Sequence, residues 1–194
     1  MPGSSSGDAR QQLRTRTSAS HARLDAHFPE GLTTPEAYAC YLAGMHRFAT
    51  DYEVAVGLLP RYSFWLARDL QHCGVTPLPP SGIFSPVGDA VERLGWDYVM
   101  AGSSVGARYL VRQAQALGHR DDAGASFLTR HAASDDWTRV LDRLAAFSPV
   151  EEDVLVRMER GAREAFAFAD RCFERGFAAT PVAPDQEPLH ESSP

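Results

Sequence analysis

Apolar side chains recur at helical spacing through almost the whole chain, and this pattern restricts the fold more than any other feature. In the first such segment, residues 8–28, intervals of three or four place on one helix face Leu13, Thr17, His21, Leu24 and Phe28. No segment alternates apolar and polar residues as a strand does, and we find no internal repeat. The 194 residues suffice for one domain with a full core. The sequence therefore predicts an all-α, single-domain bundle of six to seven helices.

Prolines, glycines and capping residues divide this pattern into segments. Further helices are predicted at 35–59, 62–73, 86–117 and 134–147, and a last one begins at Pro149. The proline-rich stretch 74–86 is predicted to be a loop. The Gly- and Ser-rich residues 1–7 and the proline-rich residues 179–194 are expected to be disordered, which leaves 8–178 as the helical domain.

Composition excludes several classes of protein. The formal net charge of −6 argues against a nucleic-acid binder. No apolar run reaches the roughly 18 residues of a membrane span, and the polar N-terminus lacks a signal-peptide core. Three widely spaced cysteines without a CxxC pair indicate neither a disulfide framework nor a zinc site. We therefore expect a cytoplasmic protein without a nucleic-acid or membrane partner.

Two glycines interrupt the helical pattern of residues 86–117 in the sequence Gly102-Ser103-Ser104-Val105-Gly106. Each interior glycine costs a helix roughly 1 kcal/mol relative to alanine, so the pair requires a reason. One reason is a kink or the close approach of backbone to a flat, bulky group. Another is a close crossing of two helices. The sequence also matches the G-x-S-x-G nucleophile elbow of serine hydrolases, in which Ser104 would be the nucleophile.

His21 stands alone among the apolar residues of its helix face. It is either a structural histidine or an axial ligand of iron through an imidazole nitrogen. Arg14 lies two turns earlier on the same face, about 10 Å along the helix axis. That separation is roughly the one between a porphyrin iron and its propionates. The pattern is therefore compatible with a heme site.

Two segments carry a resemblance to a known family. Residues 13–25, LRTRTSASHARLD, resemble the proximal helix of bacterial heme oxygenases, and residues 94–106, LGWDYVMAGSSVG, resemble their distal helix. Helix order, spacing and length extend the resemblance over residues 10–177. It is similar to the biliverdin-producing type that accompanies bacterial phytochromes.

The resemblance implies roles for individual residues. His21 would be the proximal iron ligand, and Gly102 and Gly106 would let the distal backbone lie over the porphyrin. Ser103 would order distal water, at a position where mammalian relatives carry an aspartate. Further heme contacts are implied for Arg14, Thr17, Tyr98, Ser104, Arg139, Arg143, Phe166 and Phe173.

The implied activity is the oxidative cleavage of heme, which is both substrate and cofactor. It consumes O2 and electrons from a donor such as ferredoxin or flavodoxin with its reductase, and it yields biliverdin, CO and ferrous iron. A bacterial phytochrome is an implied recipient of the biliverdin. Three alternatives remain: a non-catalytic heme or tetrapyrrole carrier, the serine hydrolase, and a diiron carboxylate enzyme. The last normally requires Glu-x-x-His pairs, and the sequence offers only Asp69-x-x-His72.

Overall fold

The computed structural model describes residues 8–81 and 87–179, which form seven α-helices and no β-strand. The helices are α1 (Ala9–Asp25), α2 (Pro35–Ala55), α3 (Tyr62–Cys73), α4 (Ala90–Ala116), α5 (Ser126–Ala132), α6 (Asp136–Ala145) and α7 (Glu152–Ala179). The prediction of an all-α bundle is confirmed. The expectations for residues 1–7 and 180–194 lie outside the described residues, as does the part of the predicted loop at 82–86.

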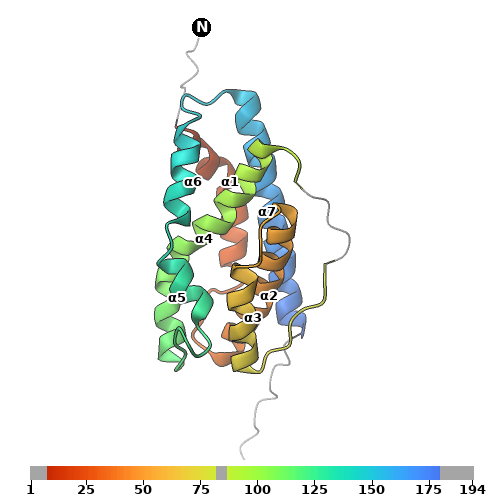
Figure 1. Ribbon diagram of the computed structural model, residues 1–194, viewed down its shortest axis with the longest axis vertical. Helices are drawn as coiled ribbons and strands as arrows, with labels where there is room; N and C mark the ends of the chain where they lie inside the picture. Colours follow the sequence, from red (N-terminus) through yellow and green to blue (C-terminus); the bar gives the residue numbers. More distant parts are fainter. Residues whose placement is uncertain (1–7, 82–86, 180–194) are drawn as a thin grey trace, which may run out of the picture.

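Helix α7 is the element against which the others are assembled. It packs along α4, α2 and α1, while α5 and α6 cover other parts of α4 and α3 packs on α2. Helix α1 also contacts α6, but within the described residues it does not pack on α4. Figure 1 shows α7 running along one side of the bundle and α4 changing direction along its length. Helices α1 and α4 run in the same direction in this view.

Local sequence explains several helix ends. The Thr34 side chain accepts a hydrogen bond from the Ala37 amide at the start of α2, and Asp89 does the same for α4. The predicted start of the last helix at Pro149 is wrong, because α7 begins at Glu152. The amide of Ser148 still donates to the Ala145 carbonyl, so this residue belongs to the turn that ends α6.

Glycines allow α4 and α7 to cross at very short distance. A Cβ at Gly95 would lie 2.2 Å from the Met158 carbonyl oxygen, and one at Gly161 would lie 2.1 Å from the Glu92 carbonyl oxygen. No side chain fits between backbones this close. The close crossing therefore occurs at Gly95 and Gly161, not at the glycine pair of residues 102–106.

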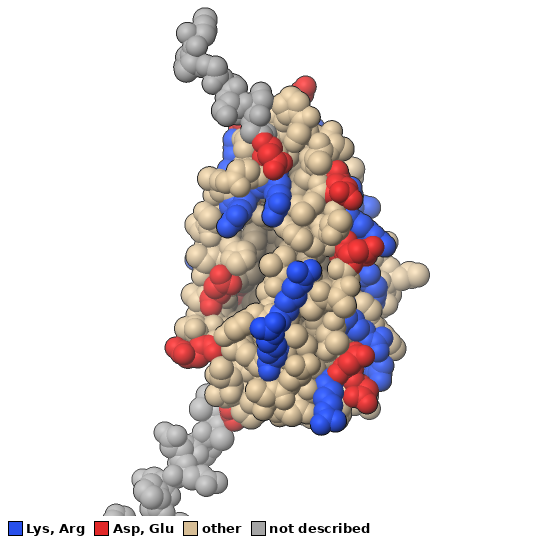
Figure 2. Space-filling view, turned by 90° about the vertical axis from the view of Figure 1, so that its left-hand side faces the viewer, with Lys and Arg blue, Asp and Glu red and all other residues tan. Residues whose placement is uncertain are grey.

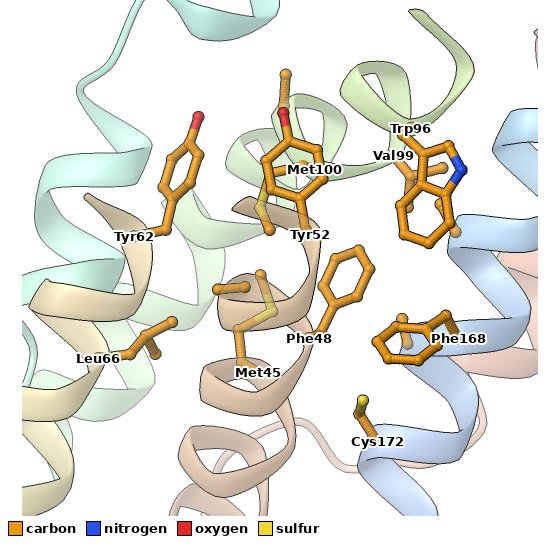
Figure 3. Packing of buried hydrophobic residues seen from close by; sticks show 14 of the residues in the cluster. Met45, Phe48, Tyr52, Tyr62, Leu66, Trp96, Val99, Met100, Phe168 and Cys172 are labelled. Atoms are coloured by element: carbon orange, nitrogen blue, oxygen red, sulfur yellow. The ribbon is translucent and has the colours of Figure 1, made fainter. Parts of the chain in front are cut away.

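The core lies between α2, α3, α4 and α7. Figure 3 shows Phe48, Trp96 and Phe168 grouped within it, and the hydroxyl groups of Tyr52 and Tyr62 pointing to its edge. Those hydroxyls donate to Asp97 and Asp136 respectively. Among the described helices, none combines the length and apolar character of a membrane span.

Candidate functional site

The side chain of Tyr98 on α4 reaches that of Thr17 on α1, although the two helices do not pack against each other. Its hydroxyl is hydrogen-bonded to Thr17, and the guanidinium groups of Arg14 and Arg10 lie near it. Burial raises the pKa of Tyr98, while the hydrogen bond and the two positive charges oppose that rise. The structure thus brings together three residues that the sequence assigned to one site, namely Arg14, Thr17 and Tyr98.

Beyond this contact the two helices continue without packing against each other. His21 and Gly102 each lie four residues further along their helices, which is about 6 Å of axial distance. A Cβ at Gly106 would meet no atom within 4 Å, whereas one at Gly102 would only touch the Trp137 ring at 3.4 Å. The neighbouring side chains Val105 and Tyr109 are 53% and 62% exposed. The surface of α4 is therefore open at Gly106, whereas the Trp137 ring lies against it at Gly102.

Figure 2 shows the side of the molecule formed by α4, α5 and α6. Its surface is hollowed near the middle and largely uncharged there, with basic side chains above and beside the hollow. Such a surface suits an apolar ligand whose charged groups remain at the rim.

The His21 imidazole lies beside a carboxylate of its own helix. Its Nδ1 lies 3.0 Å from Oδ2 of Asp25, one turn further along α1. Within the described residues its Nε2 has no partner, and the side chain is 65% exposed. The Phe166 ring packs edge-on beside it at a centroid distance of 6.0 Å. Metal-bound histidines generally donate their other ring N–H to a carboxylate or carbonyl, so the residues present fit an iron ligand.

Ser103 is partly exposed, and its hydroxyl group is hydrogen-bonded to a histidine of α5. Its Oγ lies 2.7 Å from the Met100 carbonyl oxygen and 2.8 Å from Nε2 of His131. The His131 side chain is completely buried, and burial lowers its pKa to about 4. The imidazole is therefore neutral near pH 7.

Three predicted residues lie away from the space between α1 and α4. Arg139 pairs with Asp135 and Arg143 pairs with Asp97, and both arginines line a cleft of about 800 Å³ on the other face of α4. Phe173 packs in the core against neighbouring rings. Helical spacing alone did not reveal this, because it does not say which neighbour each face meets.

The structure gives no support to two of the alternatives. Ser104 is buried in the middle of the continuous helix α4, whereas a nucleophile elbow requires a strand, a sharp turn and then a helix. Across residues 8–81 and 87–179, no group of three or more His, Cys, Asp or Glu side chains is arranged to hold a metal ion. A diiron carboxylate centre therefore has no ligand set among them.

Four residues of the candidate site were not predicted from the sequence. Asp25 could have been found, because its position four residues after His21 places both on one helix face. The ring of Trp137 lies beside Gly102 and Tyr98, and the Arg10 guanidinium lies over that ring at 5.9 Å. His131 lies on a short helix that the periodicity did not predict. These three contacts depend on packing between distant segments.

The chain resembles a known protein in fold but not detectably in sequence profile. No protein-family profile matches the chain, and no curated protein matches it significantly. Among solved structures, the chain is similar to the NO- and CO-bound heme oxygenase of Neisseria meningitidis, at 24% sequence identity and a TM-score of 0.66. The alignment covers 96% of this chain and 99% of that one. The protein therefore has the heme oxygenase fold.

Proposed function

We propose that this protein is a heme oxygenase that binds heme between α1 and α4 and cleaves it to biliverdin, CO and ferrous iron. The observation that carries the proposal is the His21–Asp25 pair. Nε2 of His21 has no partner among the described residues, and the surface of α4 is open at Gly106. The fold shared with the Neisseria meningitidis enzyme supports it. The electrons would come from a ferredoxin or flavodoxin with its reductase, and a bacterial phytochrome is a candidate recipient of the biliverdin.

The residues of α1 and α4 divide the binding task. His21 would ligate iron through Nε2 while Asp25 holds Nδ1 and so fixes the orientation of the ring. Arg14 and Tyr98, together with Arg10, would hold the propionates at the other end of the site. Arginine suits this role because its planar guanidinium grips a carboxylate through two parallel hydrogen bonds. Phe166 would support the macrocycle from beside His21.

The bound heme supplies the redox chemistry and is itself the molecule that is cut. The chain positions and shields it. Gly102 and Gly106 place no side chain of their own over the distal side of the site. The Trp137 ring lies beside Gly102, and the open surface at Gly106 would make room for O2 and for ordered water. Ser103, next to the first of these glycines, would hold one of those waters. Val105 and Tyr109 would limit the access of bulk solvent, since both are exposed on the same surface of α4.

Titration of the purified protein with hemin tests the binding step. We expect the Soret absorption of a histidine-ligated heme at a stoichiometry of one, and its loss in His21→Ala. His72→Ala is the matched control, because His72 is also exposed on a helix but lies on α3. An unchanged spectrum in His21→Ala would rule out the ligand assignment.

Turnover separates an oxygenase from a heme carrier. With ascorbate, or with ferredoxin and its reductase, under air, we expect the Soret band to decay, a bilin absorption to appear and CO to be released. A protein that binds hemin but forms neither bilin nor CO under these conditions would be a carrier. The same assay without O2 should show no bilin.

A further inference from the structure

We infer that His131 is a positioning residue that fixes the hydroxyl group of Ser103, next to Gly102 on α4, as a hydrogen-bond acceptor for water. The inference rests on the proposed function, because it concerns the water that would lie over a bound heme. It is carried by a chain of contacts that runs from α3 through α5 to α4. Nothing in the periodicity of the sequence joins these three helices.

The donor in the Ser103–His131 hydrogen bond follows from the surroundings of the imidazole. Nδ1 of His131 is buried and has no hydrogen-bond partner among the residues that the structure describes. If Ser103 donated to Nε2, the neutral ring would carry its proton on Nδ1 and would bury an unpaired N–H. If Nε2 carries the proton, only a lone pair is left unpaired. Orphaned buried N–H groups are rarer and costlier than under-satisfied acceptors, so Nε2–H donates to Ser103 Oγ.

The proton of Ser103 is then directed inward as well. Its Oγ lies 2.7 Å from the Met100 carbonyl oxygen, which accepts the hydroxyl proton. A serine hydroxyl has one proton and two lone pairs. With the proton given to Met100 and one lone pair occupied by His131, only the second lone pair is left. Ser103 is partly exposed, so a water molecule can reach that lone pair only as a donor.

The imidazole cannot easily turn to reverse this arrangement. The Phe127 ring is stacked on it at 4.9 Å, and the Tyr62 ring meets it edge-on at 5.3 Å. The helix that carries it is anchored by a buried carboxylate, because Asp69 accepts the amides of Ser126 and Phe127, each at 2.8 Å. The position of His131 is therefore set by α3 and α5, independently of any ligand.

This arrangement has a consequence for the distal water. A water that directs one O–H at Ser103 keeps its other O–H for a ligand atom on the iron side. His131 thus contributes to the orientation of a proton donor without touching heme. Its removal would free the Ser103 hydroxyl to rotate, and the water would lose its preferred orientation.

The hydrogen-bond direction can be tested in the heme-free protein. We expect the nitrogen chemical shifts of the His131 ring to show a neutral imidazole protonated at Nε2, and we expect the Nε2 and its proton resonances to shift in Ser103→Ala. Protonation at Nδ1, or resonances that do not respond to Ser103→Ala, would overturn the inference. This measurement requires neither heme nor turnover.

The positioning role is tested in the heme-loaded protein with two variants. His131→Leu removes the donor, whereas His131→Gln offers an amide N–H in the place of Nε2. In His131→Leu we expect bilin formation to slow by about five- to tenfold, the worth of one neutral hydrogen bond, with hemin affinity within about twofold of wild type. The C–O stretching frequency of the ferrous–CO complex should rise. His131→Gln should restore both toward wild type.

His46→Leu is the matched control, because His46 of α2 also has a buried Nδ1 without a partner but does not contact Ser103. Wild-type turnover and C–O frequency in His131→Leu, or equal changes in His46→Leu, would overturn the positioning role. If His131→Leu does not fold, His131→Gln is compared with Ser103→Ala instead. Turnover and C–O frequency near wild type in His131→Gln but not in Ser103→Ala would support the role, and equal changes in both would overturn it. If wild-type protein binds no hemin, the proposed function fails and this role fails with it, while the hydrogen-bond direction stands on the heme-free spectra alone.

Discussion

At the scale of single residues, the pairing of His21 with Asp25 does more than hold a side chain in place. A carboxylate at Nδ1 favours the proton on that nitrogen and leaves the lone pair of Nε2 for a ligand. Because both side chains are largely exposed, the ion pair itself adds little to folding stability. Its value lies in preparing one nitrogen for a ligand.

Asp25→Asn should therefore weaken heme binding more than folding. We expect hemin affinity to fall by about tenfold and the iron–histidine stretching frequency to decrease, because an amide orients the ring without adding negative charge. The free energy of unfolding should change by no more than about 0.5 kcal/mol. Hemin titration, resonance Raman spectroscopy and urea denaturation measure these quantities. Glu164→Gln, at an exposed position of α7, is the control and should change none of these quantities. An Asp25→Asn protein that is indistinguishable from wild type would show that Asp25 does not support the ligand.

At the scale of the helix, α4 contains glycines of two kinds. Gly95 is required by the crossing with α7, where a Cβ would collide with backbone atoms. Gly106 lies on the open surface, where a Cβ would meet nothing. The sequence shows the same residue type at both positions, and only the neighbours in space distinguish them.

The two glycines should respond oppositely to substitution. Gly95→Ala should destabilise the protein by about 2–3 kcal/mol, because α4 and α7 must move apart. Gly106→Leu should leave stability unchanged or raise it by up to about 1 kcal/mol, since leucine favours the helix, but it should prevent normal heme binding by filling the distal space. Urea denaturation and hemin titration of both variants test this. Normal hemin binding by Gly106→Leu would show that no ligand occupies that surface.

At the scale of the whole molecule, buried polar contacts join helices that are distant in sequence. Asp69 ties α3 to α5, His131 ties α5 to α4, and Arg16 ties α1 to Glu152 and Glu159 of α7. The side chains of Asp69 and His131 are completely buried, so their protonation states are coupled to folding of the bundle as a whole.

Acidification should reveal the contribution of His131 to stability. Burial lowers its pKa to about 4, with Arg61 acting in the same direction and Asp136 opposing it. The unfolded chain, with a histidine pKa of about 6.5, therefore binds more protons than the folded one between pH 6.5 and 4, and stability falls as the pH falls through this range. We expect the difference in unfolding free energy between wild type and His131→Gln to shrink by about 3 kcal/mol over that range in urea denaturation experiments. A difference that stays constant with pH would mean that the imidazole is already charged at neutral pH or is not buried.

The sequence predicted most of the fold because helical periodicity is a local property. The predicted segment 62–73 coincides with α3, and the other long helices differ only at their ends. The short helix α5 was not predicted, since its seven residues carry less than two full turns of pattern and its start is set by Asp69 from another helix. The structure places Arg14, Thr17 and Tyr98 close together, whereas Arg139 and Arg143 line a different cleft and Phe173 lies in the core.

By itself, the sequence determined that the chain is a helical bundle, with one isolated histidine on its first helix and a glycine pair in a long central one. The spacing of residues along a helix decides these features before any packing takes place. Only the tertiary structure decided which glycines serve a helix crossing and which border an open surface, and that Ser103 is held by His131. Those outcomes depend on contacts between helices far apart in the chain, which a periodic pattern does not encode.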